Sequence, residues 1–211
     1  MVRYLWGRDR MLQNCQTEAF LERLPIYLNQ LSQYSSEYVS ASILAKDLGL
    51  GEVQVRKDLA KVSQGGKPKI GYLINDLKID IETYMGFDQP TKAVIIGMGK
   101  LGRSLYNYHG FHQYHIEIIG AFDVRDSFRH IDEMNDFCQE HSIDVAILTV
   151  PREEAQKVCD MVIKAGIKAI WNFSPTRLNV PTDVVVQNEN LAVSLSILIK
   201  HYNDRRNNHG L

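Results

Sequence analysis

Apolar residues recur at helical spacing in three stretches of the first third of the chain. Residues 20–31 form one such stripe, a second covers 41–48 and is closed by Gly49, and a third covers 52–62. Two short helices with a Gly-containing turn between them indicate a helix-turn-helix. Residues 1–16 show no clear periodicity, and we expect them to form a flexible or weakly helical extension.

A turn and a strand follow the third helix. The segment "GGKPK" is typical of a tight turn, and "IGYLI" (residues 70–74) is typical of a strand that leaves it. Three helices and this β-hairpin together predict a winged helix. "LKIDIETYMGF" then predicts a connecting helix, and "DQPT" predicts a linker.

From residue 92 onward, short apolar strands alternate with helices. The predicted strands are 92–97, 116–123, 145–151, 167–173 and 184–187, and the predicted helices are 100–111, 132–141, 152–166 and 189–202. This alternation indicates parallel βαβ units. The predicted fold class is therefore α/β, with an N-terminal winged helix and a C-terminal Rossmann-like doubly wound parallel sheet. We place the three parts at 17–87, 88–188 and 189–206.

The composition is that of an ordinary soluble globular protein. Of the 211 residues, 45% are hydrophobic and 23% are charged, and the net charge is −1. No apolar run reaches the roughly 18 residues of a membrane span, and no signal-peptide core is present. The three cysteines are far apart and lack metal-ligand spacing, so we expect reduced thiols and a cytoplasmic protein.

Positive charge gathers in and after the third helix. Residues 54–69 hold five Lys or Arg side chains against Asp58 alone. The second helix of a helix-turn-helix enters the major groove, where Gln can pair with adenine and Arg with guanine. Lysines of the helix suit phosphates, and those of the turn suit the backbone or minor groove. The candidate contacts to double-stranded DNA are Gln54, Arg56, Lys57, Lys61, Lys67 and Lys69.

Two observations limit this interpretation of the basic residues. A run of charge is often only a solvated helix face. Glu52, at the start of the third helix, would repel phosphate, although an acidic side chain there also favours the helix N-terminus.

A glycine-rich loop lies between the first strand and the first helix of the second half. "GMGKLG" matches G-x-G-x-x-G, whose glycines permit a tight turn, close approach to a pyrophosphate and tight helix packing. Asp123 ends the next strand, where an acidic side chain can bind the ribose hydroxyls and disfavours a 2′-phosphate, so NAD(H) is preferred over NADP(H). Nearby Arg125 weakens this preference. The alternative is a structural turn without a ligand.

Further candidates follow later strands, because ligands of open α/β sheets bind outside the carboxyl ends of the strands. The segments "TVP" (149–151) and "NFSP" (172–175) each follow a strand. They would line the nicotinamide side of the site, or they are ordinary turns. The complete set of candidate NAD-binding residues is Gly97, Met98, Gly99, Lys100, Leu101, Gly102, Tyr108, Asp123, Thr149, Val150, Pro151, Asn172, Phe173 and Ser174.

Catalytic and metal sites are not indicated. No acid or base stands where a dehydrogenase would need one. His109, His112 and His115 lie in a loop-like segment, where such a spacing is more typical of surface residues than of a metal site. We therefore expect a binding protein and not an enzyme.

Several motifs, in order, resemble the Rex family of redox-sensing transcriptional repressors. They include "ERLPIYL", "QVRKDL", "GKPKIGY", "GMGKLGRSL", "YHGF", "AILTVP" and "NFSPTRLNVP", and the resemblance spans about residues 17–202. It implies a homodimer that binds a palindromic operator and is released by NADH, with NAD+ competing without causing release. It also implies that the last helix, 189–206, is exchanged between subunits.

The chain departs from the family pattern in places. Lys100 stands where Asn is usual, Glu52 where Ser is common, and the segment after Asp123 is shorter by about ten residues that include a strand. Asn190 replaces an Asp that, in the family, pairs with the Arg corresponding to Arg23, close to Tyr108.

Three functions are therefore considered. The first is an NAD(H)-regulated repressor. The second is a Rex-like DNA-binding paralogue with an altered or lost response to NADH. The third is a small oxidoreductase or CoA-binding domain attached to a DNA-binding fold.

Overall fold

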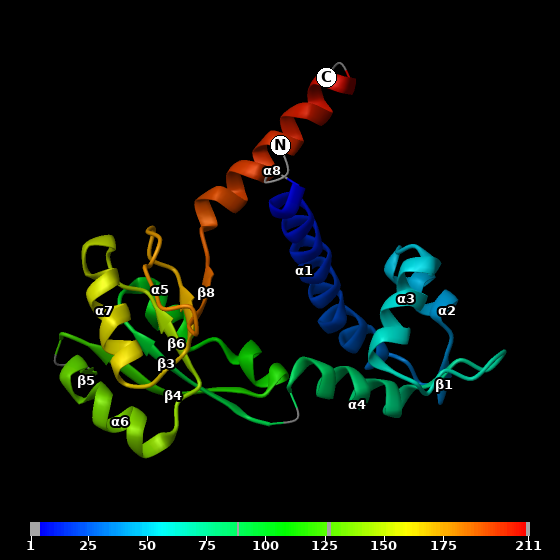
Figure 1. Cartoon of the computed structure of the whole chain (residues 1–211). Helices are drawn as coiled ribbons and strands as arrows, with labels where there is room; N and C mark the ends of the chain where they lie inside the picture. Colours follow the sequence, from blue (N-terminus) through cyan, green and yellow to red (C-terminus); the bar gives the residue numbers. More distant parts are fainter. Residues whose placement is uncertain (1–4, 88, 126–127, 210–211) are drawn as a thin grey trace. The chain divides into compact units, whose positions relative to one another are not determined.

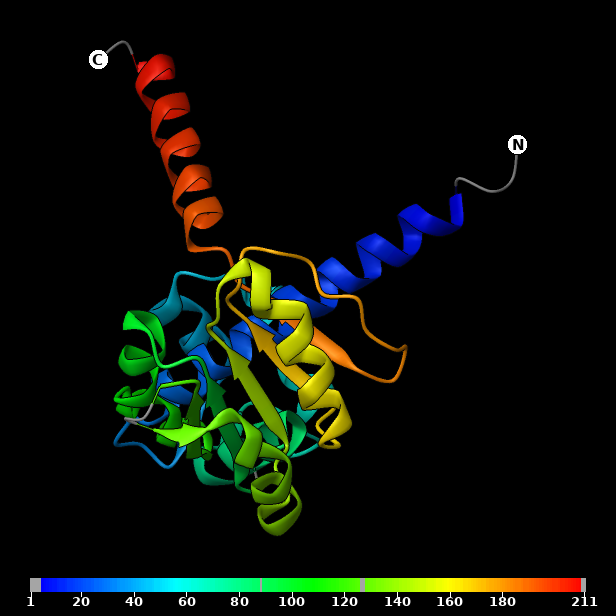
Figure 2. The same cartoon turned by 90° about the vertical axis from the view of Figure 1, so that its left-hand side faces the viewer.

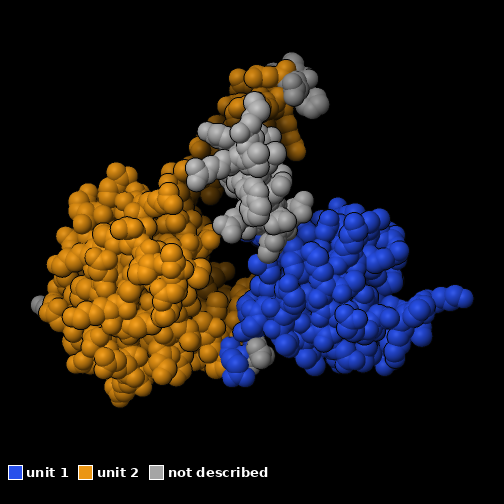
Figure 3. Space-filling model, viewed as in Figure 1, with its two compact units in different colours: residues 1–89 blue, residues 90–211 orange. Residues whose placement is uncertain are grey.

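The computed structural model describes residues 5–87, 89–125 and 128–209. The chain divides into two compact units, Met1–Gln89 (unit 1) and Pro90–Leu211 (unit 2), which Figure 3 colours separately. Each unit has its own hydrophobic core. We describe the two units separately.

Unit 1 consists of helices around one core, with a small two-stranded sheet. Its elements are α1 (Leu5–Leu31), β1 (Tyr38–Val39), α2 (Ala41–Leu48), α3 (Glu52–Val62), β2 (Tyr72–Leu73) and α4 (Ile74–Met85) (Figure 1). Leu24, Leu44, Leu59 and Leu77, one from each helix, are fully buried together. The predicted helix-turn-helix is confirmed as α2 and α3, and α1 begins at Leu5 where we expected at most weak helix.

The wing differs from the predicted hairpin. The strand expected over 70–74 is limited to β2, which pairs antiparallel with β1, and Ile74 already begins α4. The turn is closed by mutual backbone hydrogen bonds between Lys67 and Gly71, 2.9 Å in each direction. Pro68 lies inside this turn, where its missing amide proton is not needed for pairing.

Unit 2 is built on one parallel sheet. Its strands are β3 (Thr91–Ile96), β4 (Ile116–Asp123), β5 (Arg129–His130), β6 (Val145–Leu148), β7 (Ala169–Asn172) and β8 (Val185–Asn188). They lie in the order β5-β4-β3-β6-β7-β8, which is the Rossmann order with its reversal between β3 and β6. The Rossmann-like prediction is confirmed, and a ligand is expected at the carboxyl ends of β3 and β6.

Helices α5 (Lys100–Tyr106), α6 (Met134–His141) and α7 (Arg152–Lys164) cover two faces of this sheet, and short 3-10 turns lie at His109–Tyr114 and Ile131–Glu133. The terminal helix α8 (Leu191–His209) follows β8, and none of its described side chains belongs to the cores on these faces. Helices α6 and α7 pack with alternate residues of β3 and β6 in one core, and Figure 2 shows α7 (yellow) lying over the sheet. Leu105 of α5 packs on the opposite face, against Ile95 and Ile147. Strand residues of both faces are buried, as expected for a covered parallel sheet.

Three predicted elements of unit 2 have different bounds. The helix expected over 100–111 ends at Tyr106, because the Asn107 side chain donates to the carbonyl of Arg103 at 2.9 Å and a 3-10 turn follows. The shortened segment after Asp123 still carries β5, which pairs with the end of β4. The terminal helix extends to His209, and its side chains through Asn207 are all exposed. No helix in the described part of the chain is long and apolar enough to cross a membrane.

Candidate functional site

The first and third glycines of the loop are required by packing. Gly97 has φ of 97°, and a Cβ there would lie 2.8 Å from Val150 Cγ1 and 2.9 Å from the Thr149 carbonyl oxygen. A Cβ on Gly102 would overlap the carbonyl oxygen of Gly97. The Thr149 hydroxyl donates to that same carbonyl, so the loops after β3 and β6 are joined. These contacts agree with the tight turn and close packing predicted for the motif.

The second glycine faces open space. A Cβ on Gly99 would meet no atom within 4 Å, and Gly99 lines a cavity of about 870 Å³. This volume lies in the range of small-molecule and cofactor sites. The backbone at Gly99 is therefore open to a ligand that approaches closely, which is the role that the motif gives to this glycine.

The cavity brings together six of the predicted residues. These are Gly97, Gly99, Asp123, Thr149, Val150 and Pro151. They come from the carboxyl ends of β3, β4 and β6, the edge where the order of the strands reverses. The open backbone at Gly99 and the carboxylate of Asp123 therefore fit a dinucleotide.

Asp123 lies at the end of β4 and is only 6% exposed. Its carboxylate accepts from the Met98 amide at 2.6 Å, which fixes the glycine loop to β4. It also accepts from the Arg125 amide at 3.1 Å and from Arg125 Nε and Nη2 at 2.9 and 2.7 Å. The Arg125 side chain holds the pKa of Asp123 well below its ordinary value although burial opposes this, and the Met98 amide adds to the effect. Asp123 is an anion across the physiological pH range.

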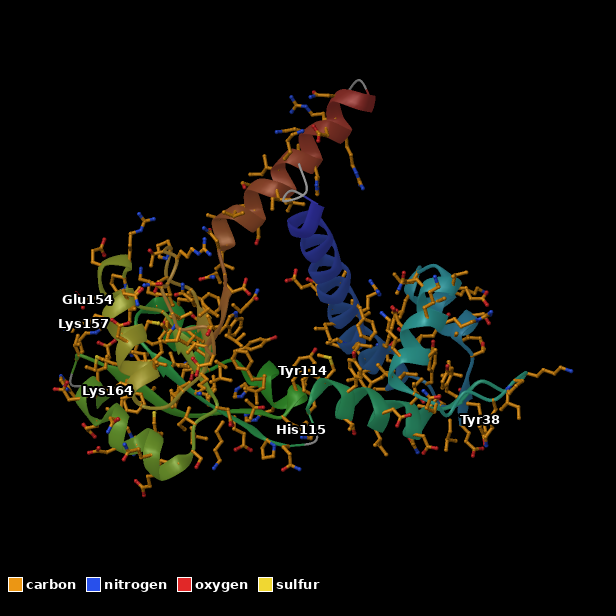
Figure 4. The ribbon with its side chains drawn as sticks, in the orientation of Figure 1. Tyr38, Tyr114, His115, Glu154, Lys157 and Lys164 are labelled. Atoms are coloured by element: carbon orange, nitrogen blue, oxygen red, sulfur yellow. The ribbon has the colours of Figure 1, made fainter. Side chains whose placement is uncertain are left out.

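Sequence reasoning missed one wall of the cavity. Successive turns of α7 contribute Glu154, Lys157, Val158 and Met161, and Figure 4 labels the first two. Their spacing of i, i+3, i+4 and i+7 is that of one helix face. The further lining residues that were missed are Ile96, Val124, Ile131 and Asp132, and Arg125, which the sequence marked only for its effect on the NADP(H) preference, lines the cavity as well. The helical periodicity of 152–166 could have identified the α7 face, but only the fold shows that it borders a cavity.

Eight predicted residues lie outside the lining of this cavity. Met98 is buried in the core on the α5 face, and Lys100, Leu101 and Gly102 belong to α5. Asn172 is fully buried, and its amide donates to the Ser174 and Thr176 carbonyls and to Asn188. The Ser174 hydroxyl donates to the Val150 carbonyl at 2.6 Å. These last two side chains hold the loop ends of β6, β7 and β8 together.

The other two, Tyr108 and Phe173, belong to a row of aromatic rings. Tyr108 contacts Phe111, Phe111 contacts Trp171, and Trp171 contacts Phe173, each pair edge to face with centroids 4.5–6.0 Å apart. Phe173 and Trp171 pack on the α5 face of the sheet. Tyr108 is 59% exposed at the end of this row.

The basic residues of unit 1 are on its surface. Gln54, Arg56 and Lys57 are exposed on α3, and Lys67 and Lys69 are exposed on the turn of the wing. The Lys61 ammonium lies 4.4 Å from the centroid of the Phe20 ring, a cation–π contact with α1. The exposed basic residues of α3 and the wing are hereafter called the basic face.

Both candidate base-reading side chains have a carboxylate partner four residues away. Arg56 pairs with Glu52 in an exposed ion pair. Gln54 Nε2 donates to Asp58 Oδ1 at 2.7 Å. This bond orients the Gln54 amide, whereas Arg56 must leave Glu52 to contact a base. Exposed ion pairs of this type contribute little stability, so the exchange costs little.

Asp58 is the centre of a buried polar network that sequence reasoning missed. It is 0% exposed and accepts from Arg23 Nε at 2.7 Å and from the Tyr27 hydroxyl at 2.8 Å, in addition to Gln54. Burial alone would raise the pKa of Asp58, but the hydrogen bonds from Arg23, Tyr27 and Gln54 hold it below its ordinary value. The network joins α3 to α1. A signal was present, because Asp58 lies on the same helix face as Val55 and Leu59.

Asn190, which departs from the family pattern, and Arg23, at the position of its family partner, both have defined contacts. The Arg23 guanidinium binds Asp58 within unit 1. Asn190 precedes α8, and its side-chain oxygen accepts from the Val193 amide at 3.1 Å, as in an N-cap. Asn and Asp are about equally effective in that position, so this contact does not require the carboxylate.

The described histidines, cysteines and acids form no group of three or more that could hold a metal ion. Cys138 and Cys159 are buried free thiols. Burial raises the pKa of Cys138, and burial together with the Asp160 charge raises that of Cys159 to about 11.

Comparison with known proteins covers nearly the whole chain. Residues 17–60 match the family model described as "Putative DNA-binding protein N-terminus", and residues 88–176 match "CoA binding domain". The redox-sensing transcriptional repressor Rex of Treponema denticola is 38% identical over 191 residues, covering 84% of this chain and 91% of that protein. Rex of Bacteroides fragilis is 36% identical over 199 residues, covering 88% and 90%.

Solved structures give the same result. A crystal structure of RSP in complex with beta-NAD+ and operator DNA has a TM-score of 0.82 at 31% identity, covering 90% of this chain and 93% of that one. RSP in complex with beta-NADH has a TM-score of 0.75 at 30% identity, covering 89% and 94%. With the winged helix, the Rossmann order and the glycine loop in place, these similarities show that the chain belongs to the Rex family of redox-sensing transcriptional repressors.

Proposed function

We propose that this protein is a homodimeric repressor that binds a palindromic operator and leaves it when NADH occupies unit 2. The ligand is regulatory, and the chain is a regulator and not an enzyme, in agreement with the names of its relatives. The observation that carries the proposal is the meeting of Gly97, Gly99 and Asp123 at one cavity, in a chain whose other unit exposes a basic recognition helix.

The residues that would hold the nucleotide follow from the site. The open backbone at Gly99 would receive the pyrophosphate, and Asp123 would receive the adenosine ribose. Thr149 and Pro151 border the same cavity after β6. Residues outside the lining, Tyr108 and Phe173 among them, remain proposed contacts for the nicotinamide end. The nicotinamide rings of bound NAD+ and bound NADH would differ in charge and shape, which is the difference that the protein would detect.

The basic face would hold the operator. Lys57, Lys67 and Lys69 would neutralise phosphates, and Gln54 and Arg56 would read bases. The relative RSP was crystallised with operator DNA, which supports this assignment for a chain of the same fold. We assign DNA binding to residues 17–87 and NAD(H) binding to residues 88–188.

The terminal helix would join the subunits. Helix α8 exposes large apolar side chains along its length, including Leu191, Leu195, Leu198 and Tyr202. Exposed apolar surface of this extent is typical of an interaction site. We propose that residues 189–206 are exchanged between two copies, which predicts a dimer by light scattering.

Control by NADH requires two arrangements of the dimer. A ligand shifts an equilibrium only by its differential affinity for the two states. NADH would favour the arrangement in which the two α3 helices do not match the half-site spacing of the operator. The comparisons do not favour a paralogue without this response. Because the operator would lie on a chromosome, the proposed location is the cytoplasm.

The function is tested with a labelled two-fold symmetric duplex, selected from a random pool by its binding to the protein. Fluorescence anisotropy is recorded as NADH or NAD+ is added to the complex. We expect NADH to release the duplex at concentrations at which NAD+ does not. Operator affinity that is unchanged by millimolar NADH would exclude the proposed regulation while leaving DNA binding intact.

Substitutions on the basic face should have two distinguishable effects. Arg56→Ala is expected to remove about 1–3 kcal/mol of sequence discrimination, because a bidentate base contact is lost. Lys67→Ala should weaken binding to all sequences and make the salt dependence shallower, because a phosphate contact is lost. Anisotropy titrations against selected and scrambled duplexes at several salt concentrations measure both quantities. Unchanged discrimination in Arg56→Ala would show that α3 does not read the operator through this residue.

The redox response should not depend on the described thiols. Because their pKa values are raised, Cys138 and Cys159 are protonated and unreactive at neutral pH. In a Cys15→Ser variant, we expect Ellman's reagent to react at least about tenfold more slowly with the native protein than with the protein in urea. Equal rates in the two conditions would mean that a buried thiol is open to oxidants.

A further inference from the structure

The Asp123 carboxylate has no spare acceptor position in this structure. A carboxylate offers about four lone-pair sites to donors. Asp123 accepts four hydrogen bonds, one from the Met98 amide and three from the amide and guanidinium of Arg125. A ribose hydroxyl that donates to Asp123 must therefore displace the Arg125 side chain.

Arg125 is placed to be displaced or to bind a ligand itself. Its side chain is 59% exposed, and the residue lines the same cavity as Asp123 and Gly99. The guanidinium binds Asp123 through Nε and one terminal nitrogen, so the remaining N–H groups are oriented elsewhere. Arg is the side chain best suited to bind a phosphate in bidentate geometry.

Resting on the proposed nucleotide function, we propose that Arg125 determines ribose selectivity at the adenosine end of the cavity. Bonded to Asp123, it competes with the hydroxyls of an unmodified ribose and offers a cation to a ribose that carries a 2′-phosphate. The site therefore accepts NADPH as well as NADH with little discrimination. Without Arg125, Asp123 becomes a free acceptor that favours NADH and repels the phosphate.

The other charged groups of the cavity do not replace Arg125. Lys157 lines the cavity from α7, near Glu154 on the preceding turn of the same helix. The Asp132 carboxylate lies 3.2 Å from His130 Nδ1. Among the described residues, Arg125 is the one whose side chain donates to Asp123. Removing this side chain would therefore leave the Asp123 carboxylate with only its two backbone donors among the described residues, the amides of Met98 and Arg125.

The test compares NADH and NADPH by calorimetry on the full-length protein and on Arg125→Ala. We expect the ratio of the NADPH to the NADH dissociation constant to rise about tenfold or more in the variant, which is the size of one charge-assisted hydrogen bond. The rise should have two parts, tighter NADH and weaker NADPH. The matched control is Lys157→Ala, which removes one positive charge from the same cavity and should leave NADH affinity unimproved.

Each outcome decides between the proposals. The selectivity inference is overturned if Arg125→Ala leaves the ratio of the NADPH to the NADH dissociation constant unchanged, or if the substitution weakens NADH binding. The nucleotide function stands in both cases. A Lys157→Ala variant that tightens NADH equally assigns the effect to net charge and also overturns it. Wild-type protein that binds neither nucleotide at millimolar concentration contradicts both proposals.

Discussion

Replacing Gly102 with alanine is expected to destabilise unit 2 by about 3 kcal/mol, the upper end of the usual cost of overpacking. A Cβ there would overlap the Gly97 carbonyl oxygen and lie 2.8 Å from the Thr149 hydroxyl oxygen. The overlapping atom belongs to the backbone, so rotation of a side chain cannot relieve it, and overpacking of this kind costs about 1–3 kcal/mol or more. Urea unfolding followed by Trp171 fluorescence, in a Trp6→Phe background, measures the free energy of unfolding of unit 2.

The matched control is Gly99→Ala in the same loop. A Cβ on Gly99 meets nothing within 4 Å, so unfolding should be unchanged within about 0.5 kcal/mol. The methyl group would instead occupy space that the ligand needs, and NADH affinity should fall. If Gly99→Ala bound NADH as tightly as the wild type, the proposed approach of the pyrophosphate to this backbone would be wrong.

Replacing Asp58 with alanine should destabilise unit 1 by about 3–5 kcal/mol. Removing one partner of a buried ion pair leaves the other charge uncompensated, and here Arg23, whose side chain is 20% exposed, would lose its partner. Tyr27→Phe removes one donor from the same carboxylate and should cost about 1–3 kcal/mol. Hydrogen exchange of peptides from α1 and α3 measures the loss, with unit 2 peptides as the internal control. Equal protection in the wild type and in Asp58→Ala would mean that the network adds no stability.

The same ion pair predicts how the stability of unit 1 depends on pH. The pKa of Asp58 is lowered in the folded state, so its contribution is fully present above the unfolded pKa of about 3.9. The contribution is lost as the pH falls through the folded pKa. Below about pH 4, the wild type should therefore lose stability in unit 1 more steeply than Asp58→Asn. Parallel acid profiles of the two proteins would contradict the assignment.

Much of the fold could be predicted because hydrophobic periodicity is local. The stripe of 52–62 has the same bounds as α3, and the strand 116–123 has those of β4. The length of the wing strand was overestimated. The five residues 70–74 are divided between the turn, β2 and the first residue of α4. The length of such a strand depends on its partner, here β1 from a distant segment.

The site was predictable only where a motif carries its own geometry. Gly97, Gly99 and Asp123 meet as expected, because the strand order of the fold brings their loops together. Asn172 and Ser174 lie at the right end of a strand, but internal hydrogen bonds use their polar groups. Asp58 was counted only as a charge opposing its basic neighbours, because its partner Arg23 is 35 residues away.

The most direct test of the central claim is the affinity for NADH measured with and without saturating operator duplex. If the nucleotide cavity controls the basic face, the coupling is reciprocal, and the duplex must weaken NADH binding by the same factor as NADH weakens DNA binding. We predict equal factors from calorimetry and anisotropy on the same preparation. NADH affinity that is identical in the presence and absence of bound operator would contradict the account.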